Sequence, residues 1–554
     1  MPDLVKRISL FLLFSYMGSF AYSQIGIGIN PPDPSTILHV QDTAKGLLIP
    51  RMTAAQRINI QNPAEGLMVY QTDNPAGFWY YRSGQWINTF PSNGGGKGIL
   101  ILADSITNAE AQLKIANEVG PNTQEIRILR CSKLTTVDLS MLTNSLVEVD
   151  IEDNTVLQNL NLGNLKTVET DIYVNNCPQL TTLNFASLTS IGRAFTGSNG
   201  LNISITGMQS INFPVLKQVT GWIYIDKNPA LTNLDMPQLL SQGAVLLMEN
   251  PLLASVSFHA LKKLISFFVD TAPSLTTVDF QSLETIGTFT LPANQLQTIS
   301  FPALQAITQV LTITTPQLST VFAPLLVSGK IQLTGGSLNA VNFNSLQTTT
   351  GINISATSGL LSSINFQSLQ TALSGTTNAI TISGIGTLSF PLLYKADAFT
   401  VSQVSSLSLP LLDTVNHTLD IHNSTSLASL TFPALKKTDG ITISNCGITS
   451  LSFPVLIANN NPQFTGALYI ALNPNLTSIS WPNFQAINNN YANLNNNKLP
   501  SSQVNTILAL FRATLTVFGS GTIYLRQTPA APPTGQGITD KNYLIGVGVY
   551  VDSD

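Results

Sequence analysis

A short alternation of apolar and polar residues recurs along most of this 554-residue chain. Residues 213–234, FPVLKQVTGWIYIDKNPALTNL, contain one corner, an alternating stretch, a turn, and the start of the next alternating stretch. Successive repeats begin roughly 19 to 28 residues apart, and most intervals are about 21 to 24 residues, which is the range of leucine-rich solenoid repeats. The pattern therefore predicts a solenoid, in which each coil packs mainly against its two neighbours.

Each repeat has two extended pieces and no amphipathic segment long enough for a helix between them. The first piece reads L-x-x-[LIV]-x-F, and Pro commonly follows the Phe, where the chain must leave the sheet because Pro has no N–H to donate. The second piece is a three-residue strand such as Ile223-Tyr224-Ile225, followed by an Asn-Pro or Ser/Gly turn. Examples of the first piece are Leu253-Val256-Phe258, Leu275-Val278-Phe280, Leu296-Ile299-Phe301, Leu361-Ile364-Phe366, Leu427-Leu430-Phe432 and Leu476-Ile479-Trp481. Each coil is thus expected to carry strands on more than one side.

The repeat array spans residues 131–498, with roughly sixteen coils at the leucine-rich period. A solenoid cannot leave its first apolar edge in water, so residues 99–130 are interpreted as an N-terminal cap. Its helix is expected to have Thr107 or Asn108 as N-cap and to carry Ala111, Ile115 and Ala116 on one face.

Residues 499–554 are interpreted as the C-terminal cap. Its predicted helix begins at an N-cap Ser501 or Ser502. One helical face then carries five apolar residues, Val504, Ile507, Leu508, Leu510 and Phe511.

The N-terminal part of the chain differs from the repeat array. Residues 1–23 combine Lys6 and Arg7, an apolar run and a small-x-small site, which is typical of a secretory signal peptide. Residues 24–90 form a small β module with short strands at residues 67–70 and 78–81, and residues 91–98 form a glycine-rich linker.

The motifs GLLIPRMT at residues 46–53, AEGLMVY at residues 64–70, Tyr80-Tyr81 and Trp86 resemble a module of exported proteins from Gram-negative bacteria. That module often precedes tail-fibre-like or adhesin-like regions, so the resemblance implies an exported surface protein. Trp79 and Trp86 could bind a glycan, but packing of a small β module is the favoured role.

The repeats themselves are similar to those of receptor L-domains and their fungal cell-wall and bacterial relatives. The similarity is clearest in TGWIYIDKNPALT at residues 220–232 and ALYIALNPNLT at residues 467–477. It implies a mainly β, right-handed leucine-rich-repeat solenoid used in ligand binding or surface architecture. The disulfide-rich flanks of receptor versions and a GPI-type hydrophobic tail are absent from this sequence, so receptor signalling is not implied.

Composition narrows the choice of partner. Charged residues make up only 10% of the chain and the net charge is −4, which argues against nucleic acid or an anionic membrane as the main partner. No segment after the signal peptide is apolar over a length that would cross a bilayer, so no transmembrane span is expected.

The three cysteines are predicted to be buried free thiols. Cys131 and Cys177 occupy the place held by Asn154 and Asn228 in other repeats, three residues before the first Leu. They lie two coils apart, roughly 9–10 Å at the usual strand spacing, beyond the ~7 Å that a disulfide can span. Cys446 is interpreted as a similar turn residue.

No catalytic residue, metal site or cofactor is predicted. The sequence contains no phosphate-binding glycine loop, HExxH motif or nucleophile elbow. His417 and His422 lie on one predicted strand with Asp420, which is expected to face water; a weak metal site there is disfavoured against ordinary surface residues. His259 replaces a corner Pro.

The candidate binding residues come from the outward position of each second strand. In chain order this position is predicted to hold Tyr173, Ser204, Tyr224, Leu246, Phe268, Thr290, Thr312, Gln332, Asn353, Thr381, Thr400, Asp420, Thr442 and Tyr469. Tyr173, Trp222, Tyr224 and Phe268 are the candidate site, an apolar strip for a protein or glycan partner. The alternative is simply good β propensity on an exposed sheet, where Tyr and Thr are favoured.

The favoured function is therefore adhesion or recognition by an exported, non-catalytic protein that is secreted or held at the outer surface of a Gram-negative bacterium. Two alternatives stay open. One is a structural component of a fibre or surface layer, with oligomerisation through the N-terminal module, and the other is a polysaccharide-degrading solenoid enzyme, which the scarcity of charged residues disfavours.

Overall fold

The computed structural model describes residues 24–554 except 74–75, 89–95, 144, 193–199, 293, 357–360, 377–378, 460–467, 485, 488–490 and 515–520. The predicted signal peptide and residues 91–95 of the predicted linker lie outside this part of the chain. The chain divides into two compact units, Met1–Gly95 and Gly96–Asp554.

The first unit is a small β structure with one short helix, α2(Ala54–Ile58). β1(Ile25–Ile27) and β2(Leu38–Val40) form a parallel pair, and β3(Arg51–Met52), β4(Met68–Gln71), β5(Gly77–Arg82) and β6(Gln85–Asn88) form a second sheet. β4 and β5 pair antiparallel, which confirms the two predicted strands. The guanidinium carbon of Arg57 lies 3.7 Å from the ring centre of Trp79 and 5.4 Å from that of Trp86, so both indoles take part in packing.

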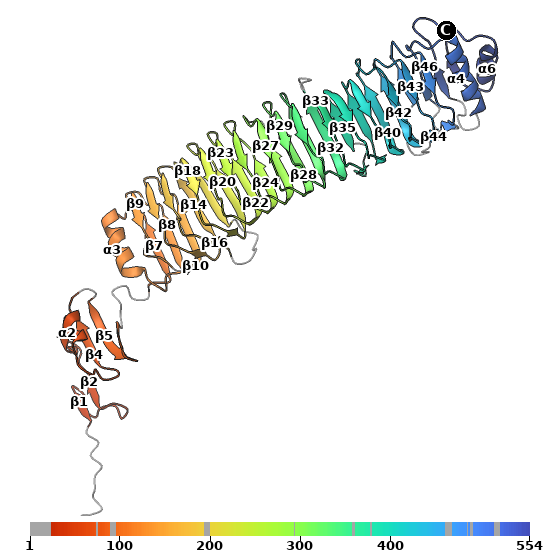
Figure 1. The fold of residues 1–554 in the computed structure, drawn as a ribbon. Helices are drawn as coiled ribbons and strands as arrows, with labels where there is room; N and C mark the ends of the chain where they lie inside the picture. The colour runs from red at the N-terminus through yellow and green to blue at the C-terminus, as the bar shows by residue number, and fades with distance from the viewer. Residues whose placement is uncertain are drawn as a thin grey trace, which may run out of the picture. The chain divides into compact units, whose positions relative to one another are not determined.

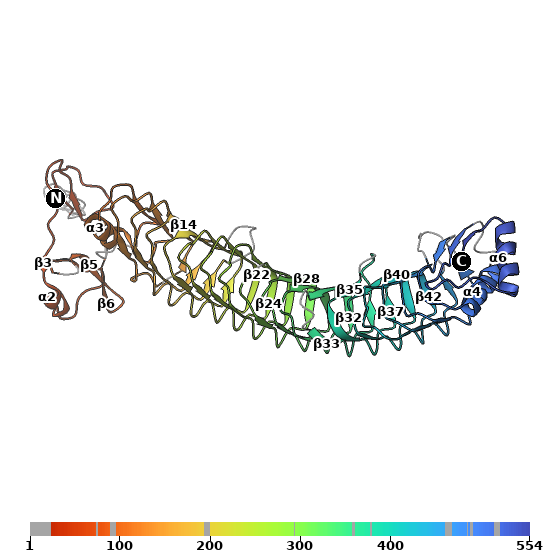
Figure 2. The ribbon, with the colours of Figure 1, turned by 90° about the horizontal axis from the view of Figure 1, so that it is seen from above.

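The second unit is a parallel β-solenoid of about 18 turns, and the predicted mainly β solenoid fold is confirmed. Figures 1 and 2 show its coils stacked in chain order from α3 at one end to α4 and α6 at the other. One face is a 28-stranded sheet, called here the main sheet, and the opposite side carries several small sheets.

The long ladder of the main sheet consists of β7(Ile99–Ala103), β8(Glu125–Leu129), β11(Glu148–Glu152), β14(Ile172–Cys177), β17(Leu201–Thr206), β20(Trp222–Asp226), β22(Ser241–Met248), β24(Lys263–Val269), β26(Thr285–Leu291), β28(Ala306–Thr314), β30(Ser328–Gly335), β32(Thr348–Ala356), β35(Ile380–Ser383), β38(Phe399–Ser402), β40(Thr414–His422), β42(Lys437–Ser444), β45(Leu468–Ala471), β48(Tyr491–Asn493), β49(Thr522–Tyr524) and β50(Tyr550–Asp552). Short corner strands of the same sheet are β10(Ser145–Leu146), β13(Thr167–Val168), β16(Ser190–Ile191), β19(Gln218–Val219), β34(Thr371–Ala372), β37(Lys395–Ala396), β44(Ala458–Asn459) and β47(Ala486–Ile487). In several central coils the corner strand and the main strand are continuous.

The small sheets contain the L-x-x-[LIV]-x-F pieces. They are built from β9(Thr136–Asp138), β12(Asn159–Asn161), β15(Thr182–Asn184), β18(Ser210–Asn212), β21(Asn233–Asp235), β23(Ser255–Ser257), β25(Thr277–Asp279), β27(Thr298–Ser300), β29(Thr320–Phe322), β31(Ala340–Asn342), β33(Leu361–Asn365), β36(Ile385–Ser389), β39(Ser406–Ser408), β41(Leu430–Thr431), β43(Ser450–Ser452) and β46(Ser478–Ser480).

Apolar side chains from both sides of each coil fill the interior. Leu231 and Leu234 of the first piece and Ile223 and Ile225 of the second are all 0% exposed, as their alternation predicts. Equivalent Phe residues stack from coil to coil; the ring centres of Phe258 and Phe280, for example, are 5.8 Å apart. The core is thus continuous along the stack, and its position dictates which residues are left to face water.

In several coils a buried asparagine closes the turn that follows the main strand. Asn228 donates from Nδ2 to the carbonyl of Ile203 in the preceding coil, and its Oδ1 accepts from the backbone N–H of Thr206, both at 3.0 Å. The residue before it, Lys227, has a φ of 52°, which turns the chain sharply at this point. The Asn side chain therefore pairs backbone groups that no strand can pair.

The three cysteines take this same turn position and are buried and unbridged, as predicted. Asn154 lies between the first two: its Oδ1 accepts from the N–H of Cys131, and its Nδ2 lies 3.8 Å from the sulfur of Cys177. Burial raises the pKa of the Cys131 and Cys446 thiols to about 11. They are therefore protonated at neutral pH and poorly nucleophilic.

The N-terminal end of the solenoid is covered by α3(Asn108–Glu118), which lies between β7 and β8 in the chain. Thr107 is the N-cap and forms a capping box with Glu110, in agreement with the prediction. Ala111 and Ile115 are buried but Ala116 is exposed, so the prediction for Ala116 is wrong; one residue past Ile115, the helix has turned that position away from the core. β7 and β8 themselves extend the main sheet.

The C-terminal end is covered by α4(Ser501–Ala513) and α6(Gln536–Gly546). α4 buries Val504, Ile507, Leu508 and Phe511, as its spacing predicts, and leaves Leu510 partly exposed. The predicted serine N-cap is wrong: the helix begins one residue earlier than a Ser501 cap would allow.

Pro500 takes the N-cap place and makes no side-chain hydrogen bond, because its side chain has no oxygen to accept one; its fixed φ suits the entry into a helix. The second helix, α6, was not expected from the sequence. It is joined to α4 by a 2.6 Å ion pair between Arg512 and Asp540.

Candidate functional site

The outer face of the main sheet presents side chains in columns. Neighbouring strands are parallel and pair in register apart from local shifts near the corners of a few coils, so outward residues of successive coils lie side by side, about 4.8 Å apart. The central column reads Tyr173, Asn202, Tyr224, Leu246, Phe268, Thr290, Thr312, Gln332, Asn353, Thr381, Thr400, Asp420, Thr442 and Tyr469.

One member of the predicted column is wrong. Asn202, not Ser204, pairs with Tyr173 and Tyr224. The sequence Leu201–Ile205 permits two registers, because either of two apolar pairs could point inward. In the structure Leu201 and Ile203 are the buried pair, and Ile205 sits in the turn with a φ of 54° and 36% exposure.

Three of the four candidate residues lie close together in this grid. Tyr224 and Phe268 flank Leu246 in three consecutive strands, and Trp222 lies two residues before Tyr224 on the same outward side of β20. These four residues, Trp222, Tyr224, Leu246 and Phe268, are called the aromatic segment. Trp222 is 42% exposed, and the other three are partly exposed.

Tyr173 is separated from the aromatic segment by one coil. The intervening strand carries Asn202 and Ser204, which are 7% and 6% exposed, and Ser204 donates to the Asn202 side chain at 2.7 Å. The predicted apolar strip is therefore interrupted by a narrow polar row. The spacing of the aromatic residues is otherwise as the alternation predicts.

Buried charge lies beside the aromatic segment. Asp226 follows Tyr224 on the outward side of β20, is 6% exposed, and contacts Lys227 at 3.3 Å. Burial, and then the neighbouring Asp226 carboxylate, raise the pKa of the Tyr224 phenol. Burial, followed by Glu152, raises the pKa of Tyr173 in the same way. Both phenols thus remain protonated at neutral pH and can donate a hydrogen bond.

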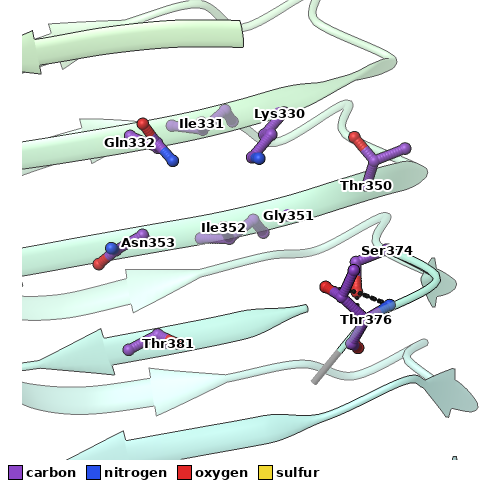
Figure 3. Close-up of a pocket in the computed structure, with 10 residues that line it drawn as sticks. All are labelled: Lys330, Ile331, Gln332, Thr350, Gly351, Ile352, Asn353, Ser374, Thr376 and Thr381. Carbon is purple, nitrogen blue, oxygen red and sulfur yellow. Dashed lines mark hydrogen bonds between the residues drawn. The ribbon is translucent and has the colours of Figure 1, made fainter. Parts of the chain in front are cut away.

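Further along the column the outer face is hollowed. The Lys330 groove has a volume of about 590 Å³ and is lined by Lys330, Ile331, Gln332, Thr350, Gly351, Ile352, Asn353, Ser374, Thr376 and Thr381. Figure 3 shows Gln332, Asn353 and Thr381 on successive strands, with the turn carrying Ser374 and Thr376 to one side. Sequence reasoning placed three of these residues in the column but did not find the groove.

The histidine cluster considered above is engaged locally. The Nδ1 atom of His422 lies 2.9 Å from Oδ1 of Asp420, and Nδ1 of His417 lies 3.9 Å from Oδ2 of Asp439. Within the described part of the chain, no three His, Cys, Asp or Glu residues are grouped so as to hold a metal ion. None of the described helices has the length and apolarity needed to cross a membrane.

Comparisons with known proteins give one family match and one similar structure. Residues 26–101 match the family model of a phage tail like trimerisation region. A crystal structure of a leucine-rich repeat protein from Bacteroides ovatus ATCC 8483 aligns with 82% of this chain and 97% of that chain, at 14% identity and a TM-score of 0.30. This similarity is too low to support an argument, so the solenoid assignment rests on the coordinates and repeats of this chain. No curated protein matches.

Proposed function

We propose that this protein is a non-catalytic recognition protein that binds a protein or glycan partner through the outer face of its main sheet. The observation that supports this most is the aromatic segment. The inward positions of the same coils are already filled, with Ile223 and Ile225 fully buried, so Trp222 and Tyr224 are not needed to fill the core. Large aromatic side chains clustered on an exposed face favour a binding surface.

We also propose that the protein is an oligomer. Among the described hydrophobic residues of the first unit, only Val69 is fully buried, while Ile37, Leu47 and Leu48 are 78%, 66% and 79% exposed. So small a core does not stabilise a unit of this size without partners. The match of residues 26–101 to a trimerisation region supports three copies of the chain as those partners.

Oligomerisation and recognition support each other. Joining three solenoids turns the second and third contacts with a partner surface into intramolecular events, which raises avidity without any new contact. Export to a bacterial surface is part of this proposal and is supported by the signal-peptide-like residues 1–23. A structural component of a fibre is the second candidate, because the first unit suits it equally well.

The test is a binding screen of the full-length protein on arrays of glycans and cell-surface proteins, followed by variants. Trp222→Ala and Tyr224→Ala should each abolish binding to the partner found and leave the melting temperature unchanged. Phe322→Ala is the control, because Phe322 is 38% exposed but lies on β29 in a small sheet. Binding that survives both substitutions in the aromatic segment would refute its role, and a protein that binds nothing on either array would favour the structural candidate.

A further inference from the structure

The Lys330 groove differs in character from the aromatic segment. Its exposed lining consists of amide and hydroxyl side chains with a single charge, Lys330. The two apolar lining residues, Ile331 and Ile352, are 0% and 2% exposed, so their side chains belong to the core. The groove therefore offers hydrogen-bonding groups and one cation, but no apolar pocket.

Lys330 lies along the groove and does not extend straight into solvent. Gly351 is its partner in the next strand, and a Cβ atom at Gly351 would lie 3.4 Å from both Cγ and Cε of Lys330. The aliphatic part of the lysine thus lies against Gly351, where a Cβ atom would just be in ordinary van der Waals contact with it. Because Gly351 has no side chain, the space beside the lysine stem stays open.

The turn beside the groove is fixed by a buried carboxylate. Asp397 is 6% exposed; its Oδ2 accepts from the N–H of Gly375 at 2.6 Å, and its Oδ1 accepts from Nδ2 of Asn416 at 2.7 Å. Gly375 has a φ of 67°, which favours glycine. Ser374 Oγ accepts from the N–H of Thr376 at 3.1 Å, so the hydroxyls of the turn are held next to the groove.

Lys330 makes no ion pair with any residue that the structure describes. Both carboxylate oxygens of Asp397 already accept hydrogen bonds, Oδ2 from Gly375 and Oδ1 from Asn416. Some other lysines of the solenoid do pair with an acidic residue of a neighbouring coil, for example Lys262 with Glu284 and Lys436 with Asp413. The groove is thus a place where a cation remains available to an anionic ligand.

We propose that the Lys330 groove binds a carboxylate-bearing saccharide. Lys330 pairs with the sugar carboxylate, and Gln332, Asn353, Thr381 and the hydroxyls of the Ser374–Thr376 turn exchange hydrogen bonds with ring hydroxyls. This site goes beyond the proposed role of the aromatic segment and does not depend on it.

The lining favours a saccharide over other anionic ligands. An acidic peptide is usually held by an open strand edge, by apolar pockets or by a cluster of basic side chains. The groove provides none of these, since its strands are paired on both sides and Lys330 is its single cation. A nucleic acid would require many cations, and the groove has one. A ligand rich in hydroxyls with a single anionic group per binding site matches the lining.

The first experiment measures binding of the full-length protein by titration calorimetry. The probes are oligogalacturonate, oligomannuronate and sialyllactose, each beside a neutral counterpart: the two methyl esters and lactose. At least one acidic probe should bind about tenfold more tightly than its neutral counterpart, and added salt should reduce this preference. Absence of binding by all three acidic probes would overturn the proposal.

The second experiment uses variants on the probe that binds. Lys330→Gln should remove the tenfold preference for the acidic form, Lys330→Arg should retain it, and Asn353→Ala should weaken the acidic and neutral forms alike. Lys437→Gln is the matched control, because Lys437 is an exposed lysine outside the groove. All four variants change partly or fully exposed side chains, so equal melting temperatures verify that each folds.

Two results would contradict the assignment. If Lys330→Gln and Lys437→Gln reduce the acidic preference equally, the effect comes from overall charge and not from the groove. If a polyglutamate peptide or inorganic phosphate binds as tightly as the acidic saccharide and competes with it, the groove is a general anion site and the saccharide assignment is wrong. If Trp222→Ala abolishes binding of the array partner while the acidic saccharide still binds, the two sites are independent and the groove assignment stands.

Discussion

At the scale of single residues, the turn asparagines do more for the solenoid than their polarity suggests. Asn473 is 0% exposed and donates from Nδ2 to the carbonyls of Ile443 and Ala471 at 2.9 and 3.1 Å. Its Oδ1 accepts from the N–H of Cys446 at 2.9 Å. One side chain therefore satisfies buried backbone groups in two successive coils.

Asn473→Ala should destabilise the protein, because these backbone groups would be left buried without partners. We expect the free energy of unfolding to fall by about 2–4 kcal/mol, measured by urea denaturation. Asn475→Ala, two residues away on an exposed side chain, should change it by less than about 0.5 kcal/mol. Equal effects of the two substitutions would show that the turn asparagine has no special role.

A second prediction concerns Cys446 and the pH dependence of its reactivity and of the protein's stability. Its pKa is raised by burial to about 11 from the ordinary value of 9.0. The native thiol should resist iodoacetamide at pH 8 and react once the chain is unfolded in urea.

The pKa of Cys446 is higher in the folded than in the unfolded chain. The contribution of this thiol to the free energy of unfolding is therefore complete below about pH 9 and is lost as the pH rises towards 11. Cys446→Ala should reduce the loss of stability in that window; rapid labelling of the native protein would contradict the burial.

At the scale of elements, each terminal helix has to cover the open end of a core that would otherwise continue. α4 does so with Val504, Ile507, Leu508 and Phe511, all buried. Leu508→Ala should lower the free energy of unfolding by about 2–5 kcal/mol, because it leaves a cavity at the end of the stack. Thr506→Ala, on the exposed side of the same helix, serves as the control. Hydrogen exchange should show the effect first in β48 and β49; uniform destabilisation of all coils would argue against a local cap.

The elements that could be predicted from sequence are those fixed by alternation of apolar residues. The inward positions of residues 213–234 follow directly from such alternation, and so do most members of the outward column. Prediction failed where two registers fit equally well, as at Ile203 and Ile205, and where backbone geometry replaced a side-chain cap, as at Pro500. α6 could not be predicted, because its sequence, Gln536–Gly546, lacks a clear apolar face and a side-chain N-cap.

The candidate sites were predictable to different degrees. Trp222 and Tyr224 stand out in the sequence because a large aromatic residue occupies an outward position of a strand. The Lys330 groove depends instead on an absence, the missing side chain of Gly351, together with a turn at Ser374–Thr376 held by Asp397 from another coil. The signal in the sequence was Lys330 aligned with Gly351 one coil later, and it becomes visible only once the register is known.

At the scale of the whole molecule, the exposed apolar residues of the first unit predict the state of association. The full-length protein should sediment with a mass of three 59.4 kDa chains, because Leu47 and Leu48 would be covered by neighbouring copies. Leu48→Asp should release single chains, since a carboxylate would be buried at the interface. Leu113→Asp makes the same change at a 66% exposed leucine of α3 and should leave the trimer intact. A wild-type protein that sediments as a single chain at micromolar concentration would refute the proposed trimer.

The in-register stacking of the coils has a consequence for how such a protein can change. Phe268 and Gln332 lie three strands apart in one column, about 14–15 Å, and that separation depends only on how many coils stand between them. Gain or loss of one whole repeat would move the two sites by one strand spacing and leave each intact. The distance between two binding sites on the main sheet can therefore change in steps of one strand spacing, by gain or loss of whole repeats, while the residues of each site stay the same.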